Sequence, residues 1–212
     1  MSKRIIIVDD HEIFCAGLAT LLQETPFEVV GSFQTTQGAE SFLGEKEVDL
    51  AILDVRLKSP DGLDSIEVFD RKYGVPSVIM SASDNPAYIA RAYVLGARDY
   101  LVKSMDGESM TNAIGRAMVG KAPMDNSLMH QIGVQLRFEP KAEAMPKGFP
   151  LTSREAQVLR HIAYGLSNRE IAISLRLSIE TIKEHVQNMI RKIGAADRTD
   201  AAVRAIKAGL VE

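Results

Sequence analysis

The sequence has little cysteine and no long apolar run, and both shortages limit what the chain can be. Its single cysteine, Cys15, cannot form a disulfide within the chain, and its place on the apolar side of a predicted helix indicates a small buried hydrophobe. Apolar runs such as residues 5–8 fall far short of the ~20 residues needed to cross a bilayer, and two aspartates follow this run at once. We therefore expect no membrane span and no export signal, and we expect a cytoplasmic protein.

Length and charge favour two domains of different character. A chain of 212 residues is long enough for one medium domain and one small one. Residues 1–120 hold 11 Lys+Arg against 18 Asp+Glu, whereas residues 121–212 hold 14 against 10. An acidic half suits a cation site and a basic half suits phosphate backbones, although an excess of this size is often only solvated surface.

Five short apolar segments in the first half are predicted as strands: residues 4–9, 28–33, 49–54, 77–81 and 99–103. They lack polar alternation, which is typical of strands buried on both faces of a parallel sheet. The stretches between them space their apolar residues as amphipathic helices do. This alternation predicts an α/β fold, a doubly wound five-stranded parallel sheet with helices on both faces.

Prolines interrupt the chain after the last of these helices. Pro123, Pro140 and Pro146 fall within residues 121–147, which we predict to be a linker between a domain of residues 1–120 and a domain of residues 148–212. Residues 124–136 could hold one short helix within it. Beyond Pro150 the pattern is helical throughout, so the second domain is predicted to be small and all-α.

Acidic, hydroxyl and ammonium groups stand where the predicted strands end. Asp9 and Asp10 end the first strand, Asp54 the third, Ser81 the fourth and Lys103 the fifth. Ligands of open parallel sheets bind beyond the carboxyl ends of the strands, so we expect these groups to meet there. Clustered carboxylates would take up protons unless a cation neutralises them. Hard oxygen ligands in this number favour Mg²⁺ or Ca²⁺, and Mg²⁺ is the better match because it needs only one or two protein carboxylates. An aspartate beside Mg²⁺ can accept a phosphoryl group covalently, which Lys103 could pair with and Ser81 could hydrogen-bond.

The residues at these strand ends resemble the receiver domain of two-component response regulators, in VDDH at 8–11, LDV at 53–55, MSAS at 80–83 and YLVKS at 100–104. The resemblance covers roughly residues 3–120 and implies a flavodoxin-like fold with Asp54 as the phosphoacceptor. It also implies a Mg²⁺ site, and a set of side chains that bind the phosphoryl group or change conformation when it is attached. The implied Mg²⁺ ligands are Asp9, Asp10, Asp54 and the Arg56 backbone carbonyl, and the implied switch and phosphoryl-binding residues are Ser81, Tyr100 and Lys103.

Two positions depart from the receiver pattern. Lys58 stands where many receivers have proline, and Ser104 replaces the proline that commonly follows the lysine. These departures concern the loop after Asp54 and the placement of Lys103.

Capping residues fix three helix starts in the second domain. Thr152 and Glu155 form one capping box, Ser167 and Glu170 form another, and Ser178 is a third N-cap. The second helix ends near residue 175, so only a brief turn separates it from the third. This is the spacing of a helix-turn-helix.

The predicted third helix, about residues 179–193, separates into an apolar face and a polar face of a length that a DNA major groove accepts. Taken alone, such a polar face is usually only solvated surface. The segments LTSREAQVL, GLSNREIA and IETIKEHVQNMIRKIG closely resemble the LuxR-type helix-turn-helix over about residues 148–212. Joined to a receiver, this is the arrangement of the NarL/FixJ subfamily.

The LuxR resemblance implies DNA contacts of two kinds. Base-reading positions match Lys183, Glu184 and Gln187, whereas Asn168, Arg169, Thr181, His185 and Arg191 would approach phosphates, with Asn188 on the same face. Glu184 faces phosphate repulsion unless it accepts from a cytosine amino group. His185 could instead be a histidine with no role in DNA binding.

Together the two resemblances imply a sequence-specific DNA-binding transcription factor rather than an enzyme. A sensor histidine kinase would phosphorylate Asp54 with Mg²⁺, and the phosphorylated chain would form a homodimer on double-stranded promoter half-sites. In an alternative, the receiver is a phosphorylation-independent dimerisation or protein-binding module. A phosphatase working through an aspartyl-phosphate would need Asp-x-Asp, but Val55 and Arg56 follow Asp54.

Overall fold

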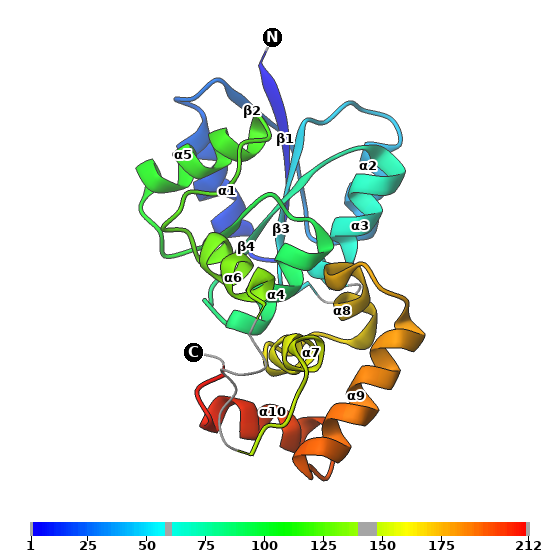
Figure 1. Ribbon diagram of the computed structural model, residues 1–212. Coiled ribbons are helices and arrows are strands. Elements are labelled where there is room, and N and C mark those ends of the chain that lie inside the picture. The colour runs from blue at the N-terminus through cyan, green and yellow to red at the C-terminus, as the bar shows by residue number, and fades with distance from the viewer. Residues whose placement is uncertain (1, 58–60, 140–147, 211–212) are drawn as a thin grey trace. The chain divides into compact units, whose positions relative to one another are not determined.

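The computed structural model describes residues 2–57, 61–139 and 148–210, and it divides into two compact units, Met1–Gln131 and Ile132–Glu212 (Figure 1). Each unit is described by itself. The departure from the receiver pattern at Lys58 and most of the predicted linker's second half, residues 140–147, lie outside the described residues. Within the described part of the chain, no helix is both long and apolar enough to span a membrane.

The first unit contains a five-stranded parallel sheet in the order β2-β1-β3-β4-β5. Each strand begins and ends within one residue of its predicted range, so the predicted sheet is confirmed. The register of β1 against β2 shifts between Ile5 and Ile6, an irregularity that the sequence pattern does not indicate. The strands are β1 (Lys3–Val8), β2 (Phe27–Phe33), β3 (Leu50–Asp54), β4 (Ser77–Ser81) and β5 (Tyr100–Val102).

Helices cover both faces of the sheet because alternate strand residues point to opposite sides. Figure 1 shows α1 and α5 on one side and α2 and α3 on the other. Ile5 and Ile7 pack with buried residues of α1 and α5, among them Cys15, which confirms its prediction as a small buried hydrophobe. The helices of this unit are α1 (Glu12–Leu22), α2 (Thr36–Leu43), α3 (Gly62–Tyr73), α4 (Pro86–Leu95) and α5 (Gly107–Met118).

Local signals set the ends of α4 as the sequence predicts. The Asn85 side chain accepts from the Ala87 amide at 2.9 Å, and Pro86 occupies the first helical position, where no backbone donor is needed. Gly96 ends the helix at a φ of 92°, a conformation that favours glycine.

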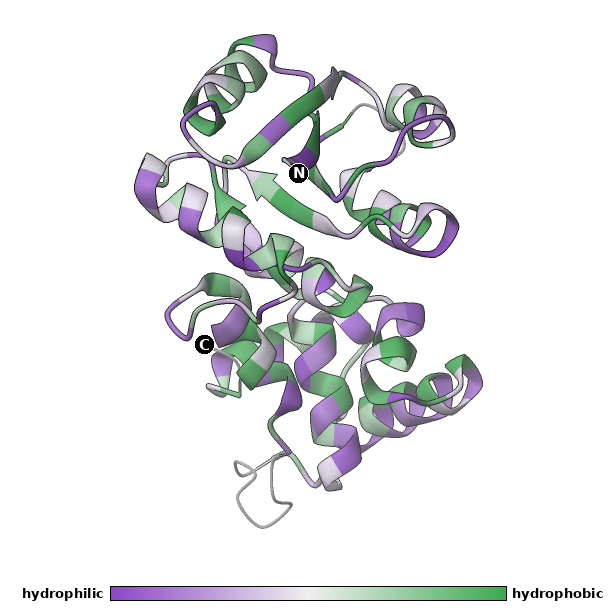
Figure 2. Ribbon diagram, turned by 90° about the horizontal axis from the view of Figure 1, so that it is seen from above, coloured by the Kyte–Doolittle hydropathy of each residue, from purple (hydrophilic) through white to green (hydrophobic). Residues whose placement is uncertain are grey.

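Helix α6 (Leu128–Arg137) lies in the segment predicted as linker, close to the short helix expected there. The helices after it are α7 (Ser153–Ala163), α8 (Asn168–Leu175), α9 (Ile179–Ile193) and α10 (Arg198–Lys207), which confirms the all-α second domain. Both predicted capping boxes form, and Ser178 accepts from the Thr181 amide at 3.0 Å. The helices carry hydrophobic and hydrophilic stripes side by side, as Figure 2 shows. The core of this unit is built from the hydrophobic stripes.

Candidate functional sites

The carboxyl ends of β1, β3 and β5 bring three of the predicted side chains together. Asp9 follows β1, Asp54 ends β3 and Lys103 follows β5. The Lys103 ammonium lies 2.5 Å from Asp9 Oδ2 and 2.8 Å from Asp54 Oδ1. Both carboxylates are almost fully buried, at 2 % and 5 % exposure, so their charges are screened little by water. The half-buried Lys103 ammonium therefore joins two strand ends that are 45 residues apart in sequence.

Asp10 and His11 extend this acidic cluster toward the surface. His11 Nδ1 lies 2.9 Å from Asp10 Oδ1 and 3.1 Å from Asp9 Oδ1, and the His11 amide donates to Asp9 at 2.9 Å. These three residues can place one ligand atom each within 4.8 Å of one another. The aspartates offer the hard oxygen donors that Mg²⁺ and Ca²⁺ prefer. The donor set thus fits a divalent cation, and His11, for which no site role is predicted from the sequence, lies beside it.

Burial and the two neighbouring carboxylates set the protonation state of Lys103. Burial disfavours its ammonium, but hydrogen bonds and charge attraction from Asp54 and Asp9 outweigh that cost, so the pKa of Lys103 is raised. The ammonium also lies 4.5 Å from the centroid of the Phe14 ring. Lys103 is therefore a permanently charged group aimed at Asp54.

The Asp54 carboxylate is oriented at both oxygens. Oδ1 faces Lys103, and Oδ2 accepts a hydrogen bond of 2.8 Å from the Arg56 amide. The Asp54 backbone carbonyl is in close contact with Gly62, where an added Cβ would lie only 1.8 Å from the carbonyl oxygen. The start of α3 thus packs directly against the backbone of Asp54, whose side chain lies at the centre of the site.

Ser81 and Tyr100 are both bonded to Ser83. Ser81 Oγ accepts from the Ser83 amide at 3.1 Å, and the Tyr100 hydroxyl donates to the Ser83 carbonyl at 2.6 Å. Ser81 ends β4 next to Lys103, whose amide donates to the Ser81 carbonyl at 2.7 Å. The Tyr100 side chain is fully buried, and burial raises its pKa, so the hydroxyl stays protonated and acts as a donor. A movement of Ser81 would therefore be transmitted to Tyr100 through Ser83.

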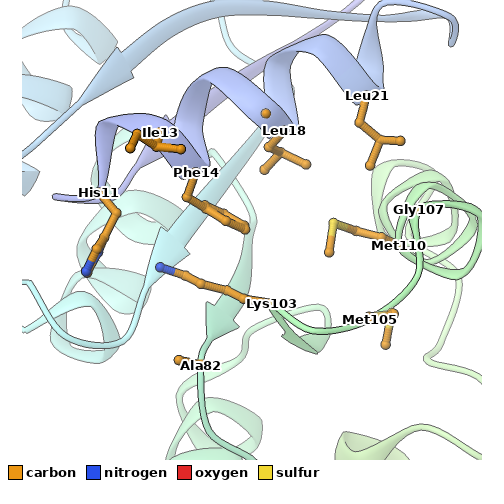
Figure 3. A pocket seen from close by; sticks show the side chains of 11 residues that line it. His11, Ile13, Phe14, Leu18, Leu21, Ala82, Lys103, Met105, Gly107 and Met110 are labelled. Carbon is orange, nitrogen blue, oxygen red and sulfur yellow. The ribbon is translucent and has the colours of Figure 1, made fainter.

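An apolar groove of about 610 Å³ opens beside Lys103, between α1 and the segment that leads from β5 into α5 (Figure 3). Phe14, Leu18 and Leu21 line it from α1, and Met105 and Met110 line it from the other side. The site is therefore polar at the strand ends and apolar at its flank.

Helix α9 of the second unit has the two faces predicted for it. Ile182, Val186, Met189 and Ile193 are buried, which leaves the opposite face to water. Among the residues predicted to read bases or approach phosphates, Lys183, Glu184, Gln187, Arg191 and Arg169 are exposed, whereas Asn168, Thr181, His185 and Asn188 are half-buried.

Several of these polar side chains have partners on the protein. Lys183 pairs with Glu180 at 2.8 Å, and Arg191 donates to Asn188 at 2.7 Å. Asn168 accepts from Arg198 of α10 at 3.1 Å. The Lys183–Glu180 and Arg191–Asn188 pairs each lie one turn apart on an exposed helix face and are weak in water, so they leave these side chains free to bind another partner.

Two contacts that brace the second unit could not be expected from local sequence patterns. The Lys192 ammonium lies 2.7 Å from Glu155 Oε2, the carboxylate that also closes the capping box of α7. His161 is fully buried and bonds to the Gln157 carbonyl and the Ser174 hydroxyl, both at 2.8 Å. Burial lowers the pKa of His161 to about 4, so its ring is neutral near pH 7.

Two protein families match the chain, one for each unit. Residues 5–115 match the response regulator receiver domain, and residues 150–205 match the bacterial regulatory proteins of the luxR family. The transcriptional regulatory protein DegU of Brevibacillus brevis is 30 % identical and covers 99 % of this chain and 95 % of its own length. The transcriptional regulatory protein LnrK of Bacillus subtilis (strain 168) is 32 % identical over 98 % of each chain.

Solved structures agree with these families at the level of the fold. The RcsB response regulator of Salmonella typhimurium aligns with a TM-score of 0.57 at 22 % identity, over 97 % of this chain and 99 % of that one. A structure of the two-component response regulator RcsB in complex with DNA aligns equally well, over 98 % and 99 %.

Proposed function

Because the chain belongs to the response regulators that join a receiver domain to a LuxR-type DNA-binding domain, we propose that phosphorylation of Asp54 controls its binding to promoter DNA. The observation that carries the proposal is the buried contact between Lys103, Asp54 and Asp9 at the strand ends. It supplies an oriented acceptor carboxylate and a fixed positive charge beside it. We assign the receiver to residues 1–120, a linker to residues 121–147 and the DNA-binding domain to residues 148–212.

The cation we propose for the site is Mg²⁺, held by Asp9, Asp10, Asp54 and the Arg56 backbone carbonyl. When bound, it would neutralise the clustered carboxylates and offset the negative charge of an incoming phosphoryl group. The His11 contact to both leading aspartates, at 2.9 and 3.1 Å, keeps their oxygens close together.

Asp54 is the proposed nucleophile of the transfer. One of its oxygens forms the new bond to phosphorus while the phosphorus–nitrogen bond of a phosphohistidine breaks, and the histidine nitrogen keeps the electron pair. Lys103 already lies 2.8 Å from Asp54, so its ammonium can pair with the phosphoryl oxygens without a large movement. The donor we infer is a sensor histidine kinase, in the cytoplasm where promoter DNA is also found.

Ser81 and Tyr100 are the proposed switch. A phosphoryl oxygen on Asp54 would accept from the Ser81 hydroxyl, and Ser81 is linked to the Tyr100 hydroxyl through Ser83. A shift at β4 therefore changes the packing of the aromatic ring at β5. Such a change would alter the receiver surface and favour a homodimer that matches two-fold symmetric half-sites.

Phosphorylation can be tested with the purified chain, a small phosphodonor and Mg²⁺. We expect a mass gain of one phosphoryl group that hydroxylamine removes, because hydroxylamine cleaves acyl phosphates. Asp54→Asn should abolish the gain, whereas Asp70→Asn, at an exposed position on α3, should leave it intact. A chain that gains no phosphoryl group but still binds DNA as a dimer would instead support the receiver as a phosphorylation-independent dimerisation module.

For the DNA-binding domain we propose that α9 enters the major groove with Lys183, Glu184 and Gln187 toward the bases. The surrounding residues would contact phosphates, and they are Asn168, Arg169, Thr181, His185, Asn188 and Arg191. Support comes from the polar face of α9, which lies opposite its buried face.

The phosphate contacts can be tested by the salt dependence of DNA binding. Removing one phosphate contact lowers the slope of log affinity against log salt by about one unit, so Arg191→Ala should flatten it by that amount. Arg71→Ala, on the receiver, is the matched control and should leave the slope unchanged. An unaltered slope for Arg191→Ala would remove this residue from the phosphate contacts.

A further inference from the structure

We propose that Phe14 is a positioning residue that holds the Lys103 ammonium beside Asp54 through a cation–π contact. The inference rests on the proposed function, in which Lys103 pairs with a phosphoryl group on Asp54. Phe14 itself touches none of the reacting atoms and acts through the lysine.

The geometry places the ring where it can act on the ammonium. Lys103 Nζ lies 4.5 Å from the centroid of the Phe14 ring, well inside the ~6 Å over which a cation is attracted to an aromatic face. Figure 3 shows the nitrogen end of Lys103 next to this ring at the edge of the apolar groove. The Lys103 side chain is only 15 % exposed, so water competes weakly for the ammonium.

The ring is held in place by the fold. Phe14 lies in the first turn of α1, the helix that begins just after Asp9 and Asp10. It packs against the core that α1 and α5 form with the sheet. Lys103, by contrast, has a four-carbon stem with many rotamers, and it follows the last strand of the sheet. A fixed ring therefore restrains a flexible cation.

The charges around Lys103 explain why an uncharged contact is useful there. In the structure, Asp9 and Asp54 attract the ammonium from two sides. A divalent cation held by Asp9 and Asp10 would neutralise much of the Asp9 charge and weaken that attraction. The Phe14 ring carries no net charge, so its pull on Lys103 does not compete with a cation or with a phosphoryl group. It can therefore stay in contact with the ammonium when the carboxylates change partners.

A plain packing role for Phe14 makes a different prediction. An aliphatic side chain of similar size would fill the same space against Leu18 and Met105, which line the same groove. A packing role depends on shape alone, whereas a cation–π contact depends on the electron density of the ring. Fluorination of the ring separates the two because it removes electron density and changes shape little.

The experiment measures the affinity of the full-length chain for beryllofluoride, a phosphoryl mimic, in the presence of Mg²⁺ by titration calorimetry. Phe14 is replaced by Leu, by Tyr, and by phenylalanines that carry one, two or three ring fluorines. We expect Phe14→Leu to weaken the affinity by about three- to tenfold, the size of a partly desolvated cation–π contact. Phe14→Tyr should stay within about twofold of the natural chain, and the fluorinated series should weaken stepwise with each fluorine.

Phe27→Leu is the matched control, because Phe27 packs against the same core as Phe14. It should leave beryllofluoride affinity unchanged. Equal affinity across the fluorinated series would overturn the proposal, whatever the leucine variant does, and the series also decides the matter if Phe14→Leu folds poorly. A natural chain that binds no beryllofluoride would overturn the proposed function and this inference with it.

Discussion

Gly62 lies in close contact with the backbone of strand β3. A methyl group there would lie 1.8 Å from the Asp54 carbonyl oxygen, which is backbone and cannot rotate away. The requirement is steric, since Gly62 opens a helix, where alanine would otherwise be preferred.

We predict that Gly62→Ala destabilises the first unit by about 3 kcal/mol, at the upper end of overpacking costs, and reduces phosphorylation of Asp54. Urea denaturation and the mass assay measure the two effects. Gly17→Ala is the control, because nothing lies within 4 Å of a Cβ at this exposed position on α1. It should stabilise the helix by up to about 1 kcal/mol. A stable, fully phosphorylated Gly62→Ala chain would contradict the steric argument.

His161 makes the stability of the second unit depend on pH. Its pKa is lowered to about 4 in the folded chain by burial, against 6.5 for an ordinary histidine. Below pH 6.5 the His161 ring binds a proton in the unfolded chain, whereas in the folded chain it stays neutral until the pH falls to about 4. The stability that His161 contributes is therefore complete above pH 6.5 and is lost as the pH falls from 6.5 to 4.

We predict a loss of about 3 kcal/mol from this residue across that interval, measured by urea denaturation at a series of pH values. Replacing the hydrogen-bonded pair together, His161→Leu with Ser174→Ala, should remove this part of the pH dependence without leaving an unpaired hydroxyl. His185→Gln, on the polar face of α9, should leave it in place. The same pH dependence in the double variant would assign it to other groups.

At the scale of helices, one lysine joins the end of α9 to the start of α7. Lys192 pairs with Glu155, which is almost fully buried and also bonds to the Thr152 amide and hydroxyl at 2.8 and 2.9 Å. Burial alone would raise the pKa of Glu155, but the bonds from Lys192 and Thr152 outweigh it and lower that pKa. The Glu155 carboxylate thus serves both the N-cap of α7 and the contact between α7 and α9.

We predict that Lys192→Met destabilises the second unit by about 1–2 kcal/mol, because it removes the countercharge of a buried carboxylate. Lys183→Met is the control on the same helix. Its pair with Glu180 is exposed, so its loss should change stability by less than about 0.5 kcal/mol. Equal losses of unfolding free energy for the two substitutions, measured by urea denaturation, would show that the burial of Glu155 does not strengthen its pair with Lys192.

Elements with local signals could be predicted from the sequence, and contacts between elements could not. Asn85 with Pro86 and Gly96 set α4 by chemistry within a few residues, and the apolar runs predict the parallel strands. The Lys192 partner of Glu155 and the Ser174 partner of His161 lie 37 and 13 residues away in sequence, respectively. No periodicity relates them, because packing brings them together.

The candidate site divides in the same way. Asp9, Asp54 and Lys103 could be predicted to meet because parallel strands end at one edge of a sheet, and the structure places them together. The contact of Phe14 with Lys103 depends on how far α1 turns before it packs, which a sequence does not state. Their proposed roles in phosphorylation stay predictions until the experiments above are done.

On the scale of the whole molecule, the two compact units should respond separately to a ligand of the receiver. Beryllofluoride with Mg²⁺ is expected to bind only in the unit Met1–Gln131. Binding at a hundredfold excess over the dissociation constant stabilises a folded unit by about 2.7 kcal/mol. We therefore predict two calorimetric transitions, of which only one rises by several degrees with the ligand.

Asp54→Asn should cancel that rise and leave the other transition where it is. A single transition that moves as a whole would mean that the units unfold together. Asp70→Asn serves as the control for the substitution itself.

The strand order also sets when the proposed phosphoacceptor site is complete during synthesis of the chain. Lys103 follows β5, the edge strand that is made last, while Asp54 ends the central strand β3. A ribosome adds ~5–20 residues per second, so residues 55–103 take about 2–10 s to emerge after Asp54. In that interval a nascent Asp54 has no ammonium beside it. We therefore expect that Asp54 of a growing chain is not phosphorylated until β5 and Lys103 have been made, whatever the concentration of phosphodonor in the cell.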